Sequence, residues 1–266
     1  MGILNVTPDS FSDGGQYNRP ELALQQAFRM IDEGADIIDI GGESTRPGAD
    51  AVSVEEELER VIPVIESLRK DSDVAISIDT SKAAVMHEAV HAGAGMINDV
   101  AALAGEGAIE TAAASGVPVC LMHMQGEPRT MQQSPEYPRG VVQDVMEYLL
   151  QRVEVAERAG ISRDNLVIDP GFGFGKTLQH NFQLLEGLAQ LQSIGLPILV
   201  GMSRKSMIGN LLGVGLEERL AGSLAAAVLA MERGASIFRV HDVAQTRQAL
   251  MVVSACRDQG TPVTNH

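Results

Sequence analysis

Cationic side chains follow the last two of eight short apolar segments in this chain. Lys205 comes shortly after residues 198–200, and Arg239 and His241 come directly after residues 237–238. An arginine can hold two phosphate oxygens at once, and a lysine supplies a compact positive charge. We therefore predict an anion site, most simply for phosphate. Rim ion pairs with Asp or Glu are the alternative.

Carboxylates and an amide end three other apolar segments. These residues are Asp79, Asn98 and Asp169. Their oxygens could accept hydrogen bonds from the edge of a flat, amino-substituted heterocycle, or stabilise a developing positive charge. A buried polar network that merely fixes strand ends is one alternative. A metal site built from Asp79, Asp169 and His241 is another.

The eight apolar segments alternate with stretches of helical periodicity. Strands that are apolar throughout must be covered on both faces. Alternating strands and helices predict parallel strands with right-handed crossovers. Eight such units in 266 residues fit an α/β fold, a single (β/α)8 TIM barrel with its active site at the carboxyl ends of the strands. A doubly wound open sheet is the alternative. The predicted strands are 3–4, 37–40, 75–78, 96–97, 119–122, 166–168, 198–200 and 237–238, and the predicted helices are 20–33, 53–70, 81–92, 105–115, 139–159, 178–193, 217–233 and 243–257.

Three of the predicted connections are long. Residues 5–19 and 41–52 are polar and glycine-rich, and residues 123–138 follow the fifth strand. At the catalytic face of a barrel, the first two fit loops that close over a substrate, with ordinary surface loops as the alternative. Asn5, Thr45 and Arg46, at or near the ends of the first two strands, could add donors to the anion site.

The composition limits the classes of partner. The formal net charge is -15, which makes nucleic acid and anionic membranes poor partners. The hydrophobic fraction of 45% is ample for a large core, and no linker divides the sequence, so we predict one domain over residues 1–266. Two cysteines, no signal peptide and no membrane span indicate a cytoplasmic protein.

Three local patterns suggest other chemistry and are set aside. Residues 87–91 match the H-E-x-x-H zinc motif, but we expect both histidines on the solvent side of a helix. Residues 171–177 resemble a phosphate loop, but Pro170 stands where that loop needs glycine. We expect that stretch to place Phe172 or Phe174 against a planar ligand. Ser203 and His241 alone do not make a catalytic triad.

Five ordered motifs resemble those of dihydropteroate synthases, and together they cover nearly the whole chain. The match is closest to the chromosomal enterobacterial type. The motifs are MGILNVTPDSFSDGG (1–15), GGESTRPG (41–48), DPGFGFGK (169–176), GMSRKS (201–206) and RVHD (239–242).

The resemblance implies a transferase of folate biosynthesis. It would join 6-hydroxymethyl-7,8-dihydropterin diphosphate to p-aminobenzoate, by loss of pyrophosphate to a pterin methylene cation and attack by the amine. It implies Mg²⁺ bound through Asn5, a homodimer and inhibition by sulfonamides. Family members usually carry a further N-terminal segment, so we expect a shortened or absent barrel cap here.

The resemblance also implies roles for individual residues. Asp79, Lys205, Arg239 and His241 would be catalytic. Asp79, Asn98, Met122, Asp169, Lys205 and Arg239 would bind the pterin, Asn5, Thr45, Arg46, Arg239 and His241 would bind the diphosphate, and Phe11, Arg46, Pro47, Phe174 and Ser203 would form the p-aminobenzoate site.

Two other hypotheses remain open. A pterin-binding methyltransferase domain on the same barrel would share the pterin carboxylates but would need no diphosphate site. A non-catalytic pterin-binding module is the other, and it would not need the two polar loops at residues 5–19 and 41–52. The joint presence of Lys205, Arg239 and His241 argues against the methyltransferase, and the two loops argue against the module.

Overall fold

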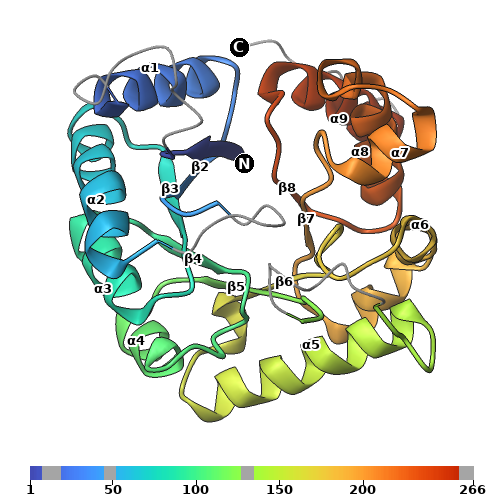
Figure 1. The fold of residues 1–266 in the computed structure, drawn as a ribbon, viewed down its shortest axis with the longest axis horizontal. Helices are drawn as coiled ribbons and strands as arrows, with labels where there is room; N and C mark the ends of the chain where they lie inside the picture. Colours follow the sequence, from blue (N-terminus) through green and yellow to red (C-terminus); the bar gives the residue numbers. More distant parts are fainter. Residues whose placement is uncertain (8–18, 45–51, 127–134, 258–266) are drawn as a thin grey trace.

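The computed structural model has a ring of helices around a central set of strands (Figure 1). It describes residues 1–7, 19–44, 52–126 and 135–257. The strands are β1 (Gly2–Asn5), β2 (Ile37–Gly41), β3 (Ala75–Asp79), β4 (Met96–Asp99), β5 (Val119–Met122), β6 (Leu166–Asp169), β7 (Leu199–Val200) and β8 (Ile237–Phe238). The α-helices are α1 (Arg19–Asp32), α2 (Val54–Asp71), α3 (Ala83–Ala92), α4 (Ala108–Ser115), α5 (Val141–Arg158), α6 (Leu178–Glu186), α7 (Ser206–Leu212), α8 (Leu220–Glu232) and α9 (Val243–Arg257).

The strands close on themselves. Strands β1 to β6 form a parallel sheet in chain order, and β7 pairs in parallel with β8. A parallel bridge between Ile168 and Ile198 joins the two sheets on one side. A second parallel bridge, between Gly2 and Val240, joins them on the other. The predicted (β/α)8 barrel is therefore confirmed, and the doubly wound alternative is wrong, because that fold reverses its strand order and leaves open edges.

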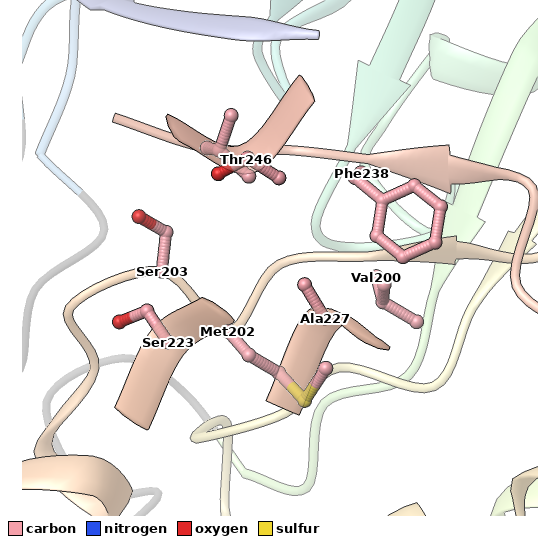
Figure 2. Close-up of a pocket in the computed structure, with 8 residues that line it drawn as sticks. Val200, Met202, Ser203, Ser223, Ala227, Phe238 and Thr246 are labelled. Atoms are coloured by element: carbon pink, nitrogen blue, oxygen red, sulfur yellow. The ribbon is translucent and has the colours of Figure 1, made fainter. Parts of the chain in front are cut away.

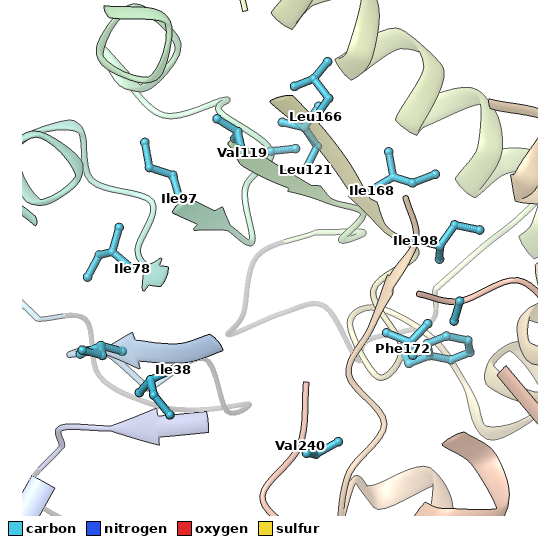
Figure 3. Packing of buried hydrophobic residues seen from close by; sticks show 14 of the residues in the cluster. Ile38, Ile78, Ile97, Val119, Leu121, Leu166, Ile168, Phe172, Ile198 and Val240 are labelled. Atoms are coloured by element: carbon cyan, nitrogen blue, oxygen red, sulfur yellow. The ribbon is translucent and has the colours of Figure 1, made fainter. Parts of the chain in front are cut away.

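The barrel has an outer and an inner apolar layer, because neighbouring residues of a strand point to opposite faces. Outward residues pack under the helices in one large cluster, which Figure 3 shows from Ile38 through Ile97 and Leu121 to Val240. Inward residues form a smaller, separate cluster of Met1, Met96, Cys120, Val167 and Leu199, against which Ile37 and Ile237 pack. On four of the strands the next inner position along the chain is polar, at Asp39, Asn98, Asp169 and Arg239. The barrel interior therefore changes from apolar to charged toward the mouth.

Two helices differ from the sequence prediction. The predicted helix 178–193 breaks at Gly187, after which residues 188–194 form a 3₁₀ helix. A Cβ on Gly187 would lie 2.6 Å from Cγ2 of Val142, so the close approach of α5 requires glycine there. Helix α7 was not predicted, because seven residues with a central glycine give too short a periodic pattern.

The start of α2 and the exposed face of α3 agree with what the sequence indicates. Ser53 caps α2 by accepting a hydrogen bond from the backbone N–H of Glu56 at 3.1 Å. In α3, Val85, Met86 and Ala89 are buried while His87 and His91 are exposed, which is the orientation expected for these histidines. Each helix in the described ranges is too short or too polar to cross a membrane.

Two adjacent leucines in α5 test the outer apolar layer. Leu149 is fully buried, whereas Leu150 is 44% exposed. Leu149→Ala should lower the free energy of unfolding by about 2–5 kcal/mol, because it removes packed methyl groups and leaves a cavity. Leu150→Ala should change it far less. Urea denaturation followed by circular dichroism measures both, and equal losses would contradict this assignment of the layer.

Candidate active site

A single guanidinium links three strands at the mouth of the barrel. Arg239, directly after β8, donates from Nε to Oδ2 of Asp39 on β2 and from Nη2 to Oδ2 of Asp79 on β3, both at 2.6 Å. The side chain of Arg239 is 19% exposed, while those of Asp39 and Asp79 are at 0% and 8%. The cation predicted for an anion site is thus held by two carboxylates, an arrangement that keeps it charged inside the barrel.

Asp39 is a site residue that the sequence prediction missed. It pairs in register with Ser77, whereas Asp79 pairs with Gly41 and Asn98, so Asp39 lies one inward position deeper in the barrel. Its Oδ2 also accepts from Nδ2 of Asn98 at 3.2 Å. The signal was present in the sequence, because a carboxylate inside an otherwise apolar strand requires a buried partner.

Burial shifts the pKa values of two acidic groups, Asp79 and Asp169, upward. It raises the pKa of Asp79 to about 7, although Arg239 acts to lower it. Burial also raises the pKa of Asp169, against the opposing effect of Lys205. Burial alone would lower the pKa of Arg239, but Asp39 and Asp79 hold it above its usual value. The arginine therefore stays charged while Asp79 lies close to its point of protonation near neutral pH.

Lys205 lies near the buried carboxylates of Asp169 and Asp79 and contacts the loop after β6. Its ammonium contacts the carbonyl oxygen of Phe172 and lies 4.5 Å from the centre of the Phe174 ring, a cation–π contact. Burial lowers its pKa to about 8, although Asp169 acts to raise it. Of the two phenylalanines considered for a planar ligand, Phe172 is buried in the core and Phe174 is half-buried. The structure thus favours Phe174.

The loop over residues 170–177 is not a phosphate loop. Lys176 points inward, where its ammonium donates to the carbonyl oxygens of Gly171 at 2.8 Å and Phe174 at 3.1 Å. It also lies 2.9 Å from Nδ1 of His123, whose pKa burial lowers to about 2. Neutral His123 therefore accepts a hydrogen bond, and Lys176 holds the backbone that carries Phe174 instead of contacting an anion.

The ends of β7 and β8 meet at Ser203. The backbone N–H of His241 donates to Oγ of Ser203 at 3.1 Å, and Nδ1 of the same histidine lies 3.2 Å from that oxygen. Next to this pair, Arg204 donates from Nε to Asp242 at 2.9 Å. Figure 2 shows the water-sized cavity, of about 10 Å³, that Ser203 lines together with Ser223 and Thr246. His241 and Ser203 are thus joined at the rim, beside the strand end that carries Arg239.

The remaining predicted site residues fall into two groups. Asn5 and Met122 lie at the carboxyl ends of β1 and β5, with Asn5 in register with Gly41 and Met122 with Asp169, as expected for the mouth. Other predicted site residues lie outside the described residues. They are Phe11, Thr45, Arg46 and Pro47.

A metal-only site receives no support. In the described part of the chain, no group of three or more His, Cys, Asp or Glu side chains could hold a metal ion. This applies to the H-E-x-x-H motif on α3 and to the alternative built from Asp79, Asp169 and His241. Asp79 instead pairs with Arg239, and Asp169 accepts from the backbone N–H of Gly171 at 2.7 Å.

Comparison with known proteins matches this chain to a family. The family model described as pterin binding enzyme matches residues 1–241, a span that contains the whole cluster around Arg239 and Lys205. The chain belongs to the pterin binding enzyme family. It is also 57% identical over 255 residues to the dihydropteroate synthase of Escherichia coli (strain K12), covering 96% of this chain and 90% of that protein.

Two solved structures of this family are close to the barrel. The Yersinia pestis dihydropteroate synthase with a sulfonamide drug complex has a TM-score of 0.93 and 56% identity, covering 97% of this chain and 94% of that one. The Xanthomonas albilineans dihydropteroate synthase in complex with 7,8-dihydropteroate has a TM-score of 0.89 and 50% identity, covering 98% and 94%. The barrel fold is therefore shared with these two dihydropteroate synthases.

The loop after β6 can be tested through two glycines with the same backbone conformation. Gly171 and Gly116 both have φ +68°, where alanine is strained by about 1–2 kcal/mol. A Cβ on Gly171 would lie 1.9 Å from the carbonyl oxygen of His123, whereas one on Gly116 would meet nothing within 4 Å. Gly171→Ala should therefore lower the free energy of unfolding more than Gly116→Ala and reduce pterin binding. Equal effects of the two variants on stability and binding would contradict the described packing of this loop.

Proposed function

We propose that this protein is a dihydropteroate synthase. It condenses 6-hydroxymethyl-7,8-dihydropterin diphosphate with p-aminobenzoate and releases 7,8-dihydropteroate and pyrophosphate. The observation that carries the proposal is the juxtaposition of buried acceptors with Arg239 and Lys205 at one barrel mouth. A ring edge rich in N–H donors and a diphosphate on the same molecule need these two kinds of group side by side.

The acceptors bind the pterin. Asp79, Asn98 and Asp169 are all more than nine-tenths buried, so hydrogen bonds from ring N–H groups to them are protected from water. Lys205 donates to the ring from the side of Phe174, and Met122 lines the slot next to Asp169. Arg239 covers one face of the ring.

The cations stabilise the leaving group. The bond between the pterin methylene carbon and the diphosphate oxygen breaks, and its electron pair leaves on that oxygen, where Arg239 and His241 bind the negative charge. The carbocation that remains is stabilised by the nearby carboxylates. The amine of p-aminobenzoate then donates its lone pair to the methylene carbon and loses a proton to complete the product.

The p-aminobenzoate site lies between the loop after β6 and the end of β7. Phe174 supplies an aromatic wall and Ser203 a polar group for the carboxylate. We assign Phe11, Arg46 and Pro47 to the same site from the motifs alone. Sulfonamides share the shape and charge of p-aminobenzoate and compete with it there.

A magnesium ion fits this site as a companion of the diphosphate. Magnesium prefers oxygen ligands, and it commonly takes one or two from the protein and the rest from phosphates and water. The amide oxygen of Asn5 at the end of β1 suits that role, and Thr45 and Arg46 would bind the same diphosphate. When bound, the ion neutralises charge on the leaving group.

We further propose a cytoplasmic homodimer. Both cysteines are free thiols, which suits a reducing compartment. Helices α7, α8 and α9 lie together on one side of the ring in Figure 1, and each carries exposed large apolar side chains, which supports pairing of these late helices. These residues are Leu211, Leu212, Leu229, Met251 and Val252.

Pyrophosphate release distinguishes the possible activities. We expect purified protein with Mg²⁺ and the pterin diphosphate to release pyrophosphate continuously only after p-aminobenzoate is added, and a sulfonamide to inhibit that release. A coupled pyrophosphate assay with product chromatography measures both. A methyltransferase domain or a binding module would bind the pterin without this release, and that result would sink the proposal.

The pH dependence of this reaction follows from two shifted groups. Asp79 must be ionised to accept from the ring, and burial raises its pKa to about 7, so kcat/KM should fall as the pH drops below that value. Lys205 must be protonated to donate, and burial lowers its pKa to about 8, so kcat/KM should fall again above it. Initial rates between pH 5.5 and 9.5 should give a narrow bell, roughly one unit wide at its top. A flat profile across pH 7–9 would show that these groups do not act as described.

A further inference from the structure

Arg239 and the pterin compete for the same carboxylate. Arg239 donates from Nη2 to Oδ2 of Asp79, the group that the pterin ring needs as an acceptor. A ligand that takes Asp79 from Arg239 removes a charged partner from a buried guanidinium, which costs several kcal/mol when nothing compensates. A second, permanent partner would keep that cost small.

We propose that Asp39 is a positioning residue that retains Arg239 while Asp79 changes partner from Arg239 to the pterin. The inference rests on the proposed function, because it assumes a pterin on Asp79. Asp39 is suited to this role by its depth, since it lies one inward position below Asp79 and is fully buried. It acts on the substrate through Arg239 and does not contact the ring.

The hydrogen bonds of Asp39 hold it in place. Its Oδ2 accepts from Nε of Arg239 at 2.6 Å and from Nδ2 of Asn98 at 3.2 Å. Its Oδ1 is buried and has no hydrogen-bond partner among the described residues. Asp39 is therefore fixed from two strands, with unused acceptor capacity that a shifted guanidinium can take up without leaving it.

Asp79, unlike Asp39, is suited to change its hydrogen-bond partner. Its pKa of about 7 shows that its charge is only weakly favoured in this environment, even beside Arg239. The charged groups that act on it are Asp39 from β2, Arg239 after β8, Asp99 from β4, Glu57 from α2 and Lys205 before α7. Most of them are acidic, so donors on a ligand are favourable new partners for Asp79.

A double-mutant cycle between Asp39 and Arg239 tests the proposal. Pterin diphosphate affinity, measured by calorimetry, should fall about tenfold in Asp39→Asn but less than about twofold when the same change is added to Arg239→Gln. Non-additivity of this kind means that Asp39 acts through Arg239. An equal loss in both backgrounds would mean that Asp39 contacts the ligand itself, and it would overturn the proposal.

The pH dependence of pterin binding provides a second measurement, which a mere loss of stability would not change. The charge of Asp39 helps to raise the pKa of Asp79, so removing it should shift the acid limb of pterin binding to lower pH. An unshifted limb in a folded Asp39→Asn variant would count against the proposal. If Asp39→Asn does not fold, the pterin affinities of Arg239→Gln and of the double variant are compared instead. Both of these variants lack the buried guanidinium, so neither leaves it without a partner. A further loss in the double variant would then overturn the proposal.

Ser77→Ala is the matched control. Ser77 pairs in register with Asp39, is fully buried and has an Oγ without a hydrogen-bond partner among the described residues. Its truncation disturbs the same layer without touching Arg239, so pterin affinity should stay within about twofold of the unaltered protein. Unaltered protein that binds no pterin, or releases no pyrophosphate with p-aminobenzoate, would instead reject the proposed function. A tenfold loss in Ser77→Ala would show that the layer as a whole, and not Asp39, controls binding.

Discussion

The charged centre of this barrel depends on the placement of one guanidinium between two carboxylates. A lone Arg239 would be unstable at this depth, as would either Asp39 or Asp79 without it. The three side chains come from β8, β2 and β3, so their pairing also requires the barrel to be closed between β8 and β1. Fold and site are therefore coupled, because the barrel positions the charges and the charges join distant parts of the barrel.

The strands could be predicted from sequence because each begins as a short apolar segment between stretches of helical periodicity. The sequence prediction failed at two individual helices. The predicted helix ends at Gly187, where the backbone packs closely against Val142. The sequence pattern of α6 does not reveal that contact. Helix α7 has too few residues to show a period. The first feature depends on tertiary packing and the second on length, and hydrophobic periodicity reports neither.

The site was predictable where a polar residue ends an apolar strand, as at Asp79, Asn98 and Asp169. Asp39 was missed because it lies in the middle of its strand, where a partner 200 residues away makes its burial possible. The inward orientation of the Lys176 side chain could not be predicted either. A glycine-rich loop ending in lysine suggests an anion, and only the position of His123 and two carbonyl oxygens turns the ammonium inward.

The buried charges of this site do not balance, and a ligand of a particular kind can compensate for the difference. Asp39, Asp79 and Asp169 face two cations, Arg239 and Lys205, and burial holds the pKa values of Asp79 and Asp169 above normal. A ligand that brings N–H donors to the acceptors relieves the acidic groups, and its own anionic group engages the cations that those acids had neutralised. Such a ligand must carry both features at a fixed separation. In the proposed reaction the same arrangement would favour charge separation, because the carboxylates would stabilise positive charge on the ring and the cations would stabilise negative charge on the leaving group.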